Sequence, residues 1–383
     1  MVALQQLAVD GYIPCTFGYG TEARNLPTLR DWIEVFRKSI PTFKAHALSD
    51  SAVPAELREA AAGQFECTFT AALDALLADP TTPAPGHPNC HPVNCLTLCQ
   101  LREDCLHAAG FRDIFAAVKA AENDRALGLL PGLLAEFDAL EGGFLAELEL
   151  ALRGVFAGNI FDLGAAASAE LHAAGGGAFA ATRAALLPRP WAVDNLGALL
   201  EAVRAPEGGG GGGAQWRAAA LFVDNAGPDV VLGMLPLARV LLKAGTKVLL
   251  MANRGPTIND VTAAELEPLL GRAAALDPAV LGPARESGAL RVVCSGSDLP
   301  VIDLTKLSQE AVDAAAECDL IVLEGMGRAI ETNLHAVFRC DSLKLGMIKH
   351  PEVAAHFSGR MYDCVCKFDR AVEVVPACQT EQA

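Results

Sequence analysis

Short apolar runs alternate with stretches of helical period through the second half of the chain. The predicted strands are Ala218–Val223, Lys247–Ala252, Leu290–Cys294, Asp319–Leu323, Leu343–Ile348 and Met361–Phe368. Between them, apolar residues recur every three or four positions, as they do on one face of a helix. Because this alternation is typical of βαβ units, we expect a mainly parallel, doubly wound sheet with helices on both faces.

The first half of the chain is predicted to be mostly helical. The predicted helices are Thr28–Ser39, Pro54–Ala78, Cys95–Ala109, Phe111–Asn123 and Gly132–Ala157. Six consecutive glycines, Gly208–Gly213, indicate a linker rather than a phosphate-binding loop, because no Lys-Ser or Lys-Thr follows them. We therefore expect a helical amino-terminal domain over 1–190, a linker over 191–217 and an α/β domain over 218–383.

Polar residues follow five successive predicted strands at the point where each strand ends. In chain order these residues are Asp224 and Asn225, Asn253, Ser295 and Ser297, Glu324, and Lys349. The carboxyl ends of parallel strands face one crevice, where ligands bind. A second acid and amide pair, Asn259 and Asp260, opens the helix after Lys247–Ala252. Two acids and two amides at one edge are oxygen donors of the kind that hold a hard divalent cation.

The same edge has features that suit an anion. Gly325 and Gly327 in EGMGRAIETN let backbone amides approach an anionic group, with Arg328 beside them and Lys349 after the next strand. The chain carries 30 basic and 46 acidic side chains, a net charge of −16. A charge of that sign argues against nucleic acid and anionic membranes as partners, so an acidic or phosphorylated small substrate would need a local cation.

Polar residues in the helical half have two interpretations. Arg102 and Glu103 in LREDC, like the acid and amide of KAAEND, are either surface ion pairs or site residues. Asn159 and Asp162 stand among apolar residues in VFAGNIFDLG, so at least one of them needs a buried partner. They could cap a helix or line a polar pocket, and the sequence leaves both readings open.

Targeting and cysteine chemistry add little to this picture. The longest apolar region, Val230–Ala252, is interrupted by three basic residues, and the first residues lack the basic start of a secretory signal. We therefore expect a soluble, cytoplasmic protein. The His and Cys residues between His87 and Cys105 lack the distant second ligand pair of a typical zinc site, which favours reduced cysteines over bound zinc.

Two other chemistries are not favoured. The first strand of the α/β half is followed by DNAGPDVVLG rather than GxGxxG, which argues against a nicotinamide or flavin enzyme. No GxSxG motif is present, which argues against a serine nucleophile at a strand-to-helix turn.

Four motifs carry a resemblance to a known family. FVDNAGPDVVLG, ANRGPTINDVT, DLIVLEGMGRAIETN and SLKLGMIKH resemble the metal-dependent damage-control phosphatases, and LREDCLHAAGFRDIFAAVKAAEND, VFAGNIFDLG and RPWAVDN also fit. The chain is most similar to stand-alone plant and algal members and to the carboxy-terminal phosphatase domain of eukaryotic pantothenate kinase four. The resemblance implies a Rossmann-like three-layer α/β/α domain with a helical amino-terminal part.

The resemblance also implies an activity and a site. Asp224, Asn225 and Asp260 match the metal ligands, for Mg²⁺, Mn²⁺, Co²⁺ or Ni²⁺, and Asp224, Asp260 and Lys349 are the catalytic candidates. The substrate-binding candidates are Arg102, Glu103, Asn159, Asp162, Asn253, Glu324, Gly325, Gly327, Arg328 and Lys349. The implied partner is a small phosphorylated metabolite, 4'-phosphopantetheine or its damaged, oxidised forms. Sugar phosphates, an S-adenosylmethionine-dependent carboxyl methyltransferase and a non-catalytic metabolite-binding protein are the alternatives, and the oligomeric state is left open.

Overall fold

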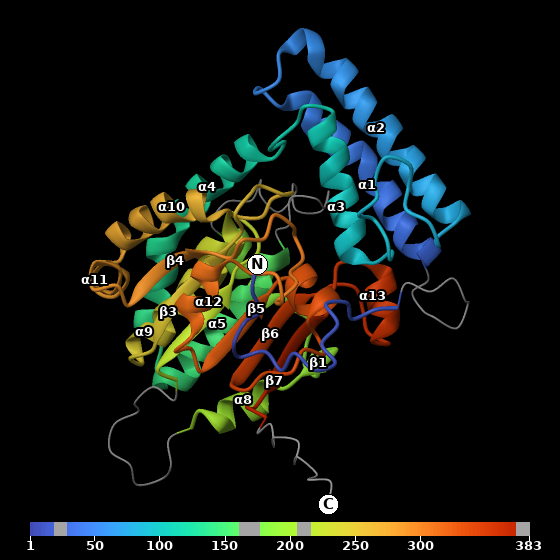
Figure 1. The fold of residues 1–383 in the computed structure, drawn as a ribbon. Coiled ribbons are helices and arrows are strands. Elements are labelled where there is room, and N and C mark those ends of the chain that lie inside the picture. The colour runs from blue at the N-terminus through green and yellow to red at the C-terminus, as the bar shows by residue number, and fades with distance from the viewer. Residues whose placement is uncertain (19–28, 161–176, 205–215, 373–383) are drawn as a thin grey trace, which may run out of the picture.

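A mainly parallel sheet forms the centre of the computed structural model, which describes residues 1–18, 29–160, 177–204 and 216–372 (Figure 1). Its strands are β1 (Val193–Asp194), β2 (Ala218–Phe222), β3 (Lys247–Ala252), β4 (Leu290–Cys294), β5 (Leu320–Glu324), β6 (Asp341–Met347) and β7 (Cys364–Asp369). They lie in the order β1-β7-β6-β5-β2-β3-β4, and the pair β6–β7 is antiparallel. The predicted α/β fold with a mainly parallel sheet is therefore confirmed.

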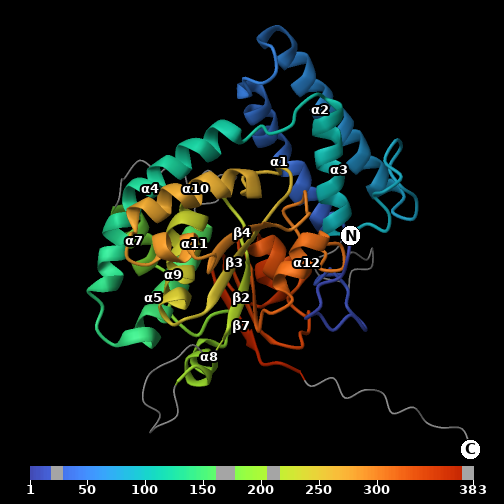
Figure 2. The same cartoon turned by 60° about the vertical axis from the view of Figure 1, so that its left-hand side comes forward.

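Helices cover both faces of the sheet, as Figure 2 shows. On one side lie α4 (Ala116–Asp138), α5 (Gly143–Ile160), α9 (Leu235–Lys243) and α10 (Ala263–Leu276), and on the other lies α12 (Gln309–Ala315). Successive residues of a strand point to opposite faces. Leu221 of β2 accordingly packs into the core shared with α5 and α9, whereas Phe222 packs into the core shared with α12. The two cores make this part of the molecule a three-layer structure.

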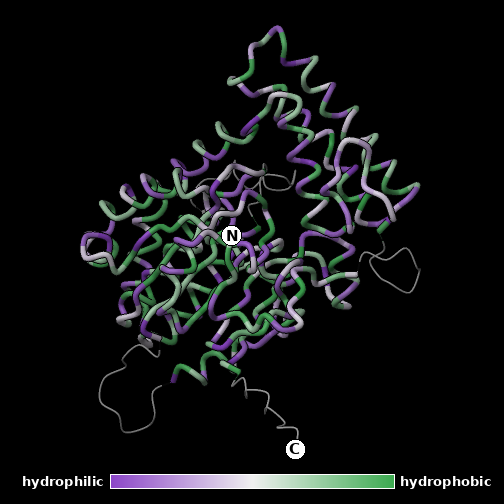
Figure 3. Tube along the Cα trace, viewed as in Figure 1, coloured by the Kyte–Doolittle hydropathy of each residue, from purple (hydrophilic) through white to green (hydrophobic). Residues whose placement is uncertain are grey.

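Three further helices stand over the carboxyl ends of the strands (Figure 1). They are α1 (Leu29–Ser49), α2 (Ala55–Ala78) and α3 (Cys95–Ala108). Along α1 and α2 hydrophilic and hydrophobic residues alternate, the pattern of helices with one buried face (Figure 3). Asn94 caps α3 by accepting the Thr97 amide at 3.0 Å. These helices form the wall that faces the strand ends.

Short elements complete the described chain. They are α7 (Gly177–Ala184), α8 (Leu196–Ala202), α11 (Leu281–Glu286), α13 (Pro351–His356), and the π-helical segments η1 (Asp229–Met234) and η2 (Met326–Thr332). None of the helices in the described ranges is long and apolar enough to cross a membrane.

Several boundaries differ from those predicted. The break expected between Asn123 and Gly132 falls instead at 139–142, between α4 and α5, where Gly142 and Gly143 adopt positive φ. Strand β1 and helix α8 lie within the range predicted as a linker, and β1 pairs with β7. The glycine run Gly208–Gly213 lies outside the described residues. The division into two domains joined by a linker stays a prediction.

The strand order places a crevice at the end of β2. The chain runs from β2 outward to β3 and β4, and then returns to place β5 on the other side of β2. In open α/β sheets, ligands bind at such a reversal, outside the carboxyl ends of the strands. The first polar residues after β2 and β5 therefore stand at the position where a site is expected.

Candidate active site

The polar residues that follow β2 and β3 meet at the carboxyl edge of the sheet. Asn225 and Asp260 face each other in an isolated antiparallel bridge. The Val261 amide donates to the Asp224 carbonyl at 3.0 Å, and the Ala226 amide donates to the carbonyl of the residue before Asp260 at 2.9 Å. The structure thus brings together the two acid and amide pairs of the sequence, and all four side chains are buried.

Arg328 of η2 lies between the two acids of these pairs. Its Nη1 donates to Asp224 Oδ1, and its Nη2 donates to Asp260 Oδ2 at 2.6 Å and to Asn253 Oδ1 at 3.0 Å. Asn253 also donates Nδ2 to Asp260 Oδ2, at 3.1 Å. Although burial opposes the charge, the carboxylates of Asp260 and Asp224 raise the pKa of Arg328 above its ordinary value. One buried guanidinium therefore contacts two buried carboxyl groups and shares its single positive charge between them.

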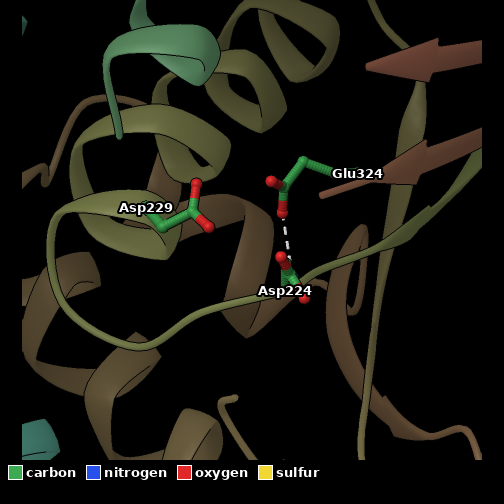
Figure 4. Close-up of side chains that lie close together, drawn as sticks. All are labelled: Asp224, Asp229 and Glu324. Carbon is green, nitrogen blue, oxygen red and sulfur yellow. Dashed lines mark hydrogen bonds between the residues drawn. The ribbon is translucent and has the colours of Figure 1, made fainter. Parts of the chain in front are cut away.

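A second layer of polar groups lies behind Asp224. Glu324, the last residue of β5, accepts the Asp224 amide at 2.9 Å. Asn159 Nδ2 donates to Glu324 Oε1 at 3.0 Å and to Asp229 Oδ2 at 3.2 Å. Asn225 Nδ2 donates to Asp229 Oδ2 at 2.8 Å and to Asp224 Oδ2 at 3.1 Å. The carboxyl groups of Asp224, Asp229 and Glu324 point toward one another (Figure 4).

The pKa values of this layer are raised. Burial, followed by the charge of Asp224, raises the pKa of Asp229 to about 6. Burial also raises the pKa of Glu324 well above its usual value, and the charges of Asp229 and Asp224 add to the shift. Close carboxylates in a low dielectric repel one another, so the cluster is stabilised by a proton or a cation.

The acids of Figure 4 could hold a metal ion. One oxygen each from Asp224, Asp229 and Glu324 lie within 4.8 Å of one another. Asp229 Oδ1 is buried and has no hydrogen-bond partner among the described residues. A buried carboxylate oxygen in that state needs an explanation, and a hard divalent cation is one that suits oxygen donors. The donor chemistry and the unpartnered oxygen therefore fit a divalent ion.

Asp229 is a site residue that the sequence analysis missed. It comes five residues after Asp224, within DNAGPDVVLG, and opens η1. The sequence feature that could have identified Asp229 is an acidic residue at the start of an otherwise apolar helical stretch.

Gly325 makes room for the Asp224 carboxylate. It has a φ of +96°, and a Cβ built there would overlap the carboxyl group of Asp224. Its amide donates to the Leu345 carbonyl at 2.9 Å, within the sheet edge. A glycine is therefore required here by backbone conformation and by the close approach of the acid.

A cleft with a volume of about 490 Å³ opens in front of these residues. Its polar lining includes Arg102, Asp224, Asn225, Asn259, Gly327 and Lys349. Its apolar lining includes Trp32, Val35, Phe36, Phe43, Phe115, Ile258, Val301 and Met326. The cleft therefore joins the charged strand ends to apolar side chains that come from α1 and from loops on the opposite side.

The predicted site residues of the helical half lie in different places, and only some of them line the cleft. Arg102 lines the cleft, with its guanidinium carbon 4.6 Å from the centre of the Phe43 ring, and pairs with Glu103 at 2.9 Å. Glu103 does not line this cleft and accepts the Thr257 hydroxyl at 2.9 Å. Asn159 lies in the buried layer behind Asp224. Asp162 lies outside the described residues.

The cysteine group between His87 and Cys105 lies at the loop before α3 and along that helix. Cys105 Sγ lies 3.8 Å from His87 Nε2, yet the cluster that converges within 4.8 Å in this part of the chain is the acidic one of Figure 4. Burial raises the pKa of Cys105 to about 11, so its thiol is protonated at neutral pH. Cys90, Cys95, Cys99 and Cys105 form no disulfide, and the preference for reduced cysteines over bound zinc stays a prediction.

The fold and site define an α/β protein with a buried acidic centre at a reversal in strand order. The damage-control phosphatase ARMT1-like domain matches residues 33–365, and the chain belongs to that family of phosphatases. It is 42% identical over 376 residues to a damage-control phosphatase of Arabidopsis thaliana, covering 96% of this chain and 97% of that protein.

Other relatives share part of their length with this chain. Identity to a pantothenate kinase 2 of Oryza sativa is 40%, covering 71% of this chain and 32% of that protein. Identity to the 4'-phosphopantetheine phosphatase of Mus musculus is 32%, covering 71% of this chain and 38% of that protein. The crystal structure of a DUF89 family protein from Pyrococcus horikoshii superposes with a TM-score of 0.57 at 17% identity, covering 89% of this chain and 97% of that one, which supports the fold.

Proposed function

We propose that this phosphatase is a metal-dependent phosphomonoesterase that hydrolyses 4'-phosphopantetheine and its oxidised or damaged forms, limiting their entry into coenzyme A synthesis. The observation that carries the proposal is the cleft that joins Asp224, Asn225 and Lys349 to a long apolar wall. Such a cleft suits a ligand with an anionic head and an extended, less polar tail. The mouse relative named for 4'-phosphopantetheine supports this choice.

In this proposal Asp224, Asn225 and Asp260 hold the cation, and Asp224 is the residue that this set shares with the acidic cluster of Asp229 and Glu324. A divalent ion there, Mg²⁺, Mn²⁺, Co²⁺ or Ni²⁺, would supply Lewis-acid polarisation of the phosphoryl oxygens. Arg328 donates to both acids and thereby fixes the orientation of their carboxyl groups. The Asn225 amide nitrogen is engaged by Asp224 and Asp229, so its oxygen is the atom available to a cation.

The remaining charged residues act on the substrate. Lys349 lines the cleft and neutralises charge on the phosphoryl group as it is transferred. Arg102 lines the same cleft and is held against Phe43, so it presents a positioned cation to the substrate. Water is the nucleophile in this scheme, with Asp224 and Asp260 orienting the reacting centre.

Apolar side chains on the wall favour 4'-phosphopantetheine over sugar phosphates. A sugar phosphate offers hydroxyl groups along its whole length, and burying hydroxyls against Val35, Phe36 and Met326 without partners is costly. The pantetheine arm carries methyl and methylene groups that gain from such burial.

A substrate panel tests the proposal. Phosphate release is measured from 4'-phosphopantetheine, its oxidised forms and hexose phosphates, with each of the four cations and with a chelator. We expect the highest kcat/KM for the pantetheine compounds and no turnover in chelator. A preference for hexose phosphates would replace the substrate assignment. Thermal stabilisation by S-adenosylmethionine without any phosphate release would favour the methyltransferase, and full function of Asp224→Ala would favour a binding protein.

A further inference from the structure

Glu331 is an acidic residue of the cleft that the roles above leave unused. It lies in η2, three residues after Arg328, and lines the cleft. Its carbonyl accepts the Thr16 amide at 2.7 Å, which ties this turn to the amino-terminal segment. Among the described residues its carboxyl group has no hydrogen bond or ion pair. An uncommitted carboxyl therefore stands on the wall beside the metal-binding edge.

Charges from four different segments surround this carboxyl. Burial, followed by electrostatic interactions with Cys15 and Asp224, raises the pKa of Glu331 to about 7, while Lys349 and Arg102 act in the opposite direction. The cation and the phosphoryl dianion of the proposed function carry opposite charges and shift this pKa in opposite directions. Near neutral pH a large share of the Glu331 carboxyl groups carry a proton.

The proposed reaction needs a proton donor at the leaving group. An aliphatic alkoxide is a poor leaving group, and a positioned acid whose pKa lies near the working pH is the best donor to it. Arg102 and Arg328 cannot serve, because a guanidinium does not give up its proton in proteins. Asp224 is already engaged in an ion pair with Arg328. Glu331 is a residue of the cleft lining whose chemistry and position fit the task.

We propose that Glu331 is the general acid that protonates the ester oxygen of the departing alcohol. The proposal rests on the phosphomonoesterase function above. As the bond from phosphorus to the ester oxygen breaks, the Glu331 proton passes to that oxygen and the neutral alcohol leaves. The oxygen of the attacking water forms the new bond to phosphorus, and one proton of that water is released to solvent. The carboxylate then takes up a proton from solvent, so the cycle closes without an oxidant or reductant.

Leaving-group dependence provides the test. An acid that protonates the leaving oxygen matters for an alkyl ester and hardly matters for p-nitrophenyl phosphate, whose phenolate leaves unaided. The substitution Glu331→Gln keeps the side-chain size and removes the transferable proton. We expect kcat/KM to fall about 100-fold or more for 4'-phosphopantetheine, within the range for general acids, and less than about 3-fold for p-nitrophenyl phosphate.

The pH profile gives a second readout. For the wild type, kcat/KM for 4'-phosphopantetheine should fall as the pH rises through about 7, because the acid loses its proton. In Glu331→Gln the residual rate should lack that fall. If Glu331 only contributed to packing, Glu331→Gln would lower kcat/KM equally for both substrates and leave the pH profile unchanged.

Controls separate catalysis from folding. Glu286→Gln makes the same chemical change at an exposed position on α11 and should leave kcat/KM unchanged for both substrates. Glu331→Asp keeps a proton donor and should recover part of the alkyl-ester activity. The thermal unfolding midpoint of Glu331→Gln, with and without Mn²⁺, should match that of the wild type. If it does not, the two substrates are compared with Glu331→Asp instead.

The outcomes are distinct. Equal losses on the two substrates, or an unimpaired Glu331→Gln, overturn the role of Glu331 while leaving the phosphatase intact. Absence of wild-type turnover on every phosphomonoester overturns the proposed function itself.

Discussion

The two sides of the cleft are built on opposite principles. The strand edge is a closed network in which Asp224, Asp260 and Arg328 are each nearly inaccessible and bonded to one another. The helical wall is apolar for much of its area, although Arg102, Ser39 and other polar residues also line it. Its residues Val35 and Phe36 line the cleft with side chains that cannot form hydrogen bonds. Hydrogen bonds fix the side-chain positions at the strand edge, whereas the wall contributes mainly the shape of its surface.

This difference indicates that the strand edge determines catalysis and that the wall determines substrate preference. A buried charge network tolerates almost no change, because each partner left alone is a desolvated charge. An apolar wall tolerates substitutions of similar volume, because the hydrophobic effect is not directional. We therefore expect changes at the strand edge to abolish function and changes at the wall to shift substrate preference.

The largest effect is expected from Arg328→Met. It leaves Asp224 and Asp260 buried without their shared cation, which should lower the free energy of unfolding by about 3–5 kcal/mol. Urea unfolding of the metal-free protein measures this. The matched control is Arg272→Met, which breaks an exposed pair with Asp124 and should cost about 0–1 kcal/mol. Equal losses in the two variants would mean that the network is not the stabilising unit described here.

A smaller effect, on activity more than stability, is expected from Gly325→Ala. The new methyl group would occupy the space of the Asp224 carboxylate and displace it. We expect phosphate release to fall by about 100-fold, the scale on which a misplaced catalytic group acts. Binding of Mn²⁺, followed by calorimetry, should weaken in parallel.

Gly288→Ala isolates the steric part of that effect. Gly288 has a φ of +76° and open space around its Cβ position, so the substitution adds backbone strain without a clash. Its activity should equal that of the wild type. If Gly288→Ala and Gly325→Ala lose activity equally, displacement of Asp224 is not the cause.

The smallest effect is expected at the wall. Val35 is half-buried, and Val35→Thr keeps its shape while adding a hydroxyl to the apolar surface. We expect KM for 4'-phosphopantetheine to rise about 5-fold, near the lower end for a single contact in an apolar pocket, with kcat unchanged. KM for p-nitrophenyl phosphate should stay the same, since that substrate has no long arm. A change in kcat, or an equal change for both substrates, would place Val35 outside the arm-binding surface.

Local pattern predicted most of the sheet. Strands β3 and β4 have the predicted bounds, β2 ends one residue earlier than predicted, and β5 is shifted by one residue at both ends. The agreement arises because a buried strand is a short apolar run closed by a polar residue. The termination of α1 was harder to predict. Helix α1 was predicted to end at Ser39 but continues through Pro41 to Ser49, although a proline inside a helix is unfavourable. Its buried face, which includes Ile40 and Phe43, supports the helix on both sides of that proline.

Part of the site could be read from the sequence as well. The pair Asp224 and Asn225 followed a strand, so its place at the sheet edge followed from topology. The partnership of Glu324 with Asn159 could not be read in this way, because it joins residues 165 positions apart whose contact depends on how α5 packs against the sheet. Asp229 was hidden for the same reason, since its partners come from α5 and from the end of β2.

The central claim is that the two strand tips form a metal-dependent phosphomonoesterase centre. The most direct test is phosphate release from 4'-phosphopantetheine by the wild type and by Asp260→Asn, each with Mn²⁺ and with EDTA. Release by the wild type only with Mn²⁺, and a loss of about 100-fold or more in Asp260→Asn, is the predicted result. Release that continues in EDTA, or an Asp260→Asn variant as active as the wild type, would contradict the account.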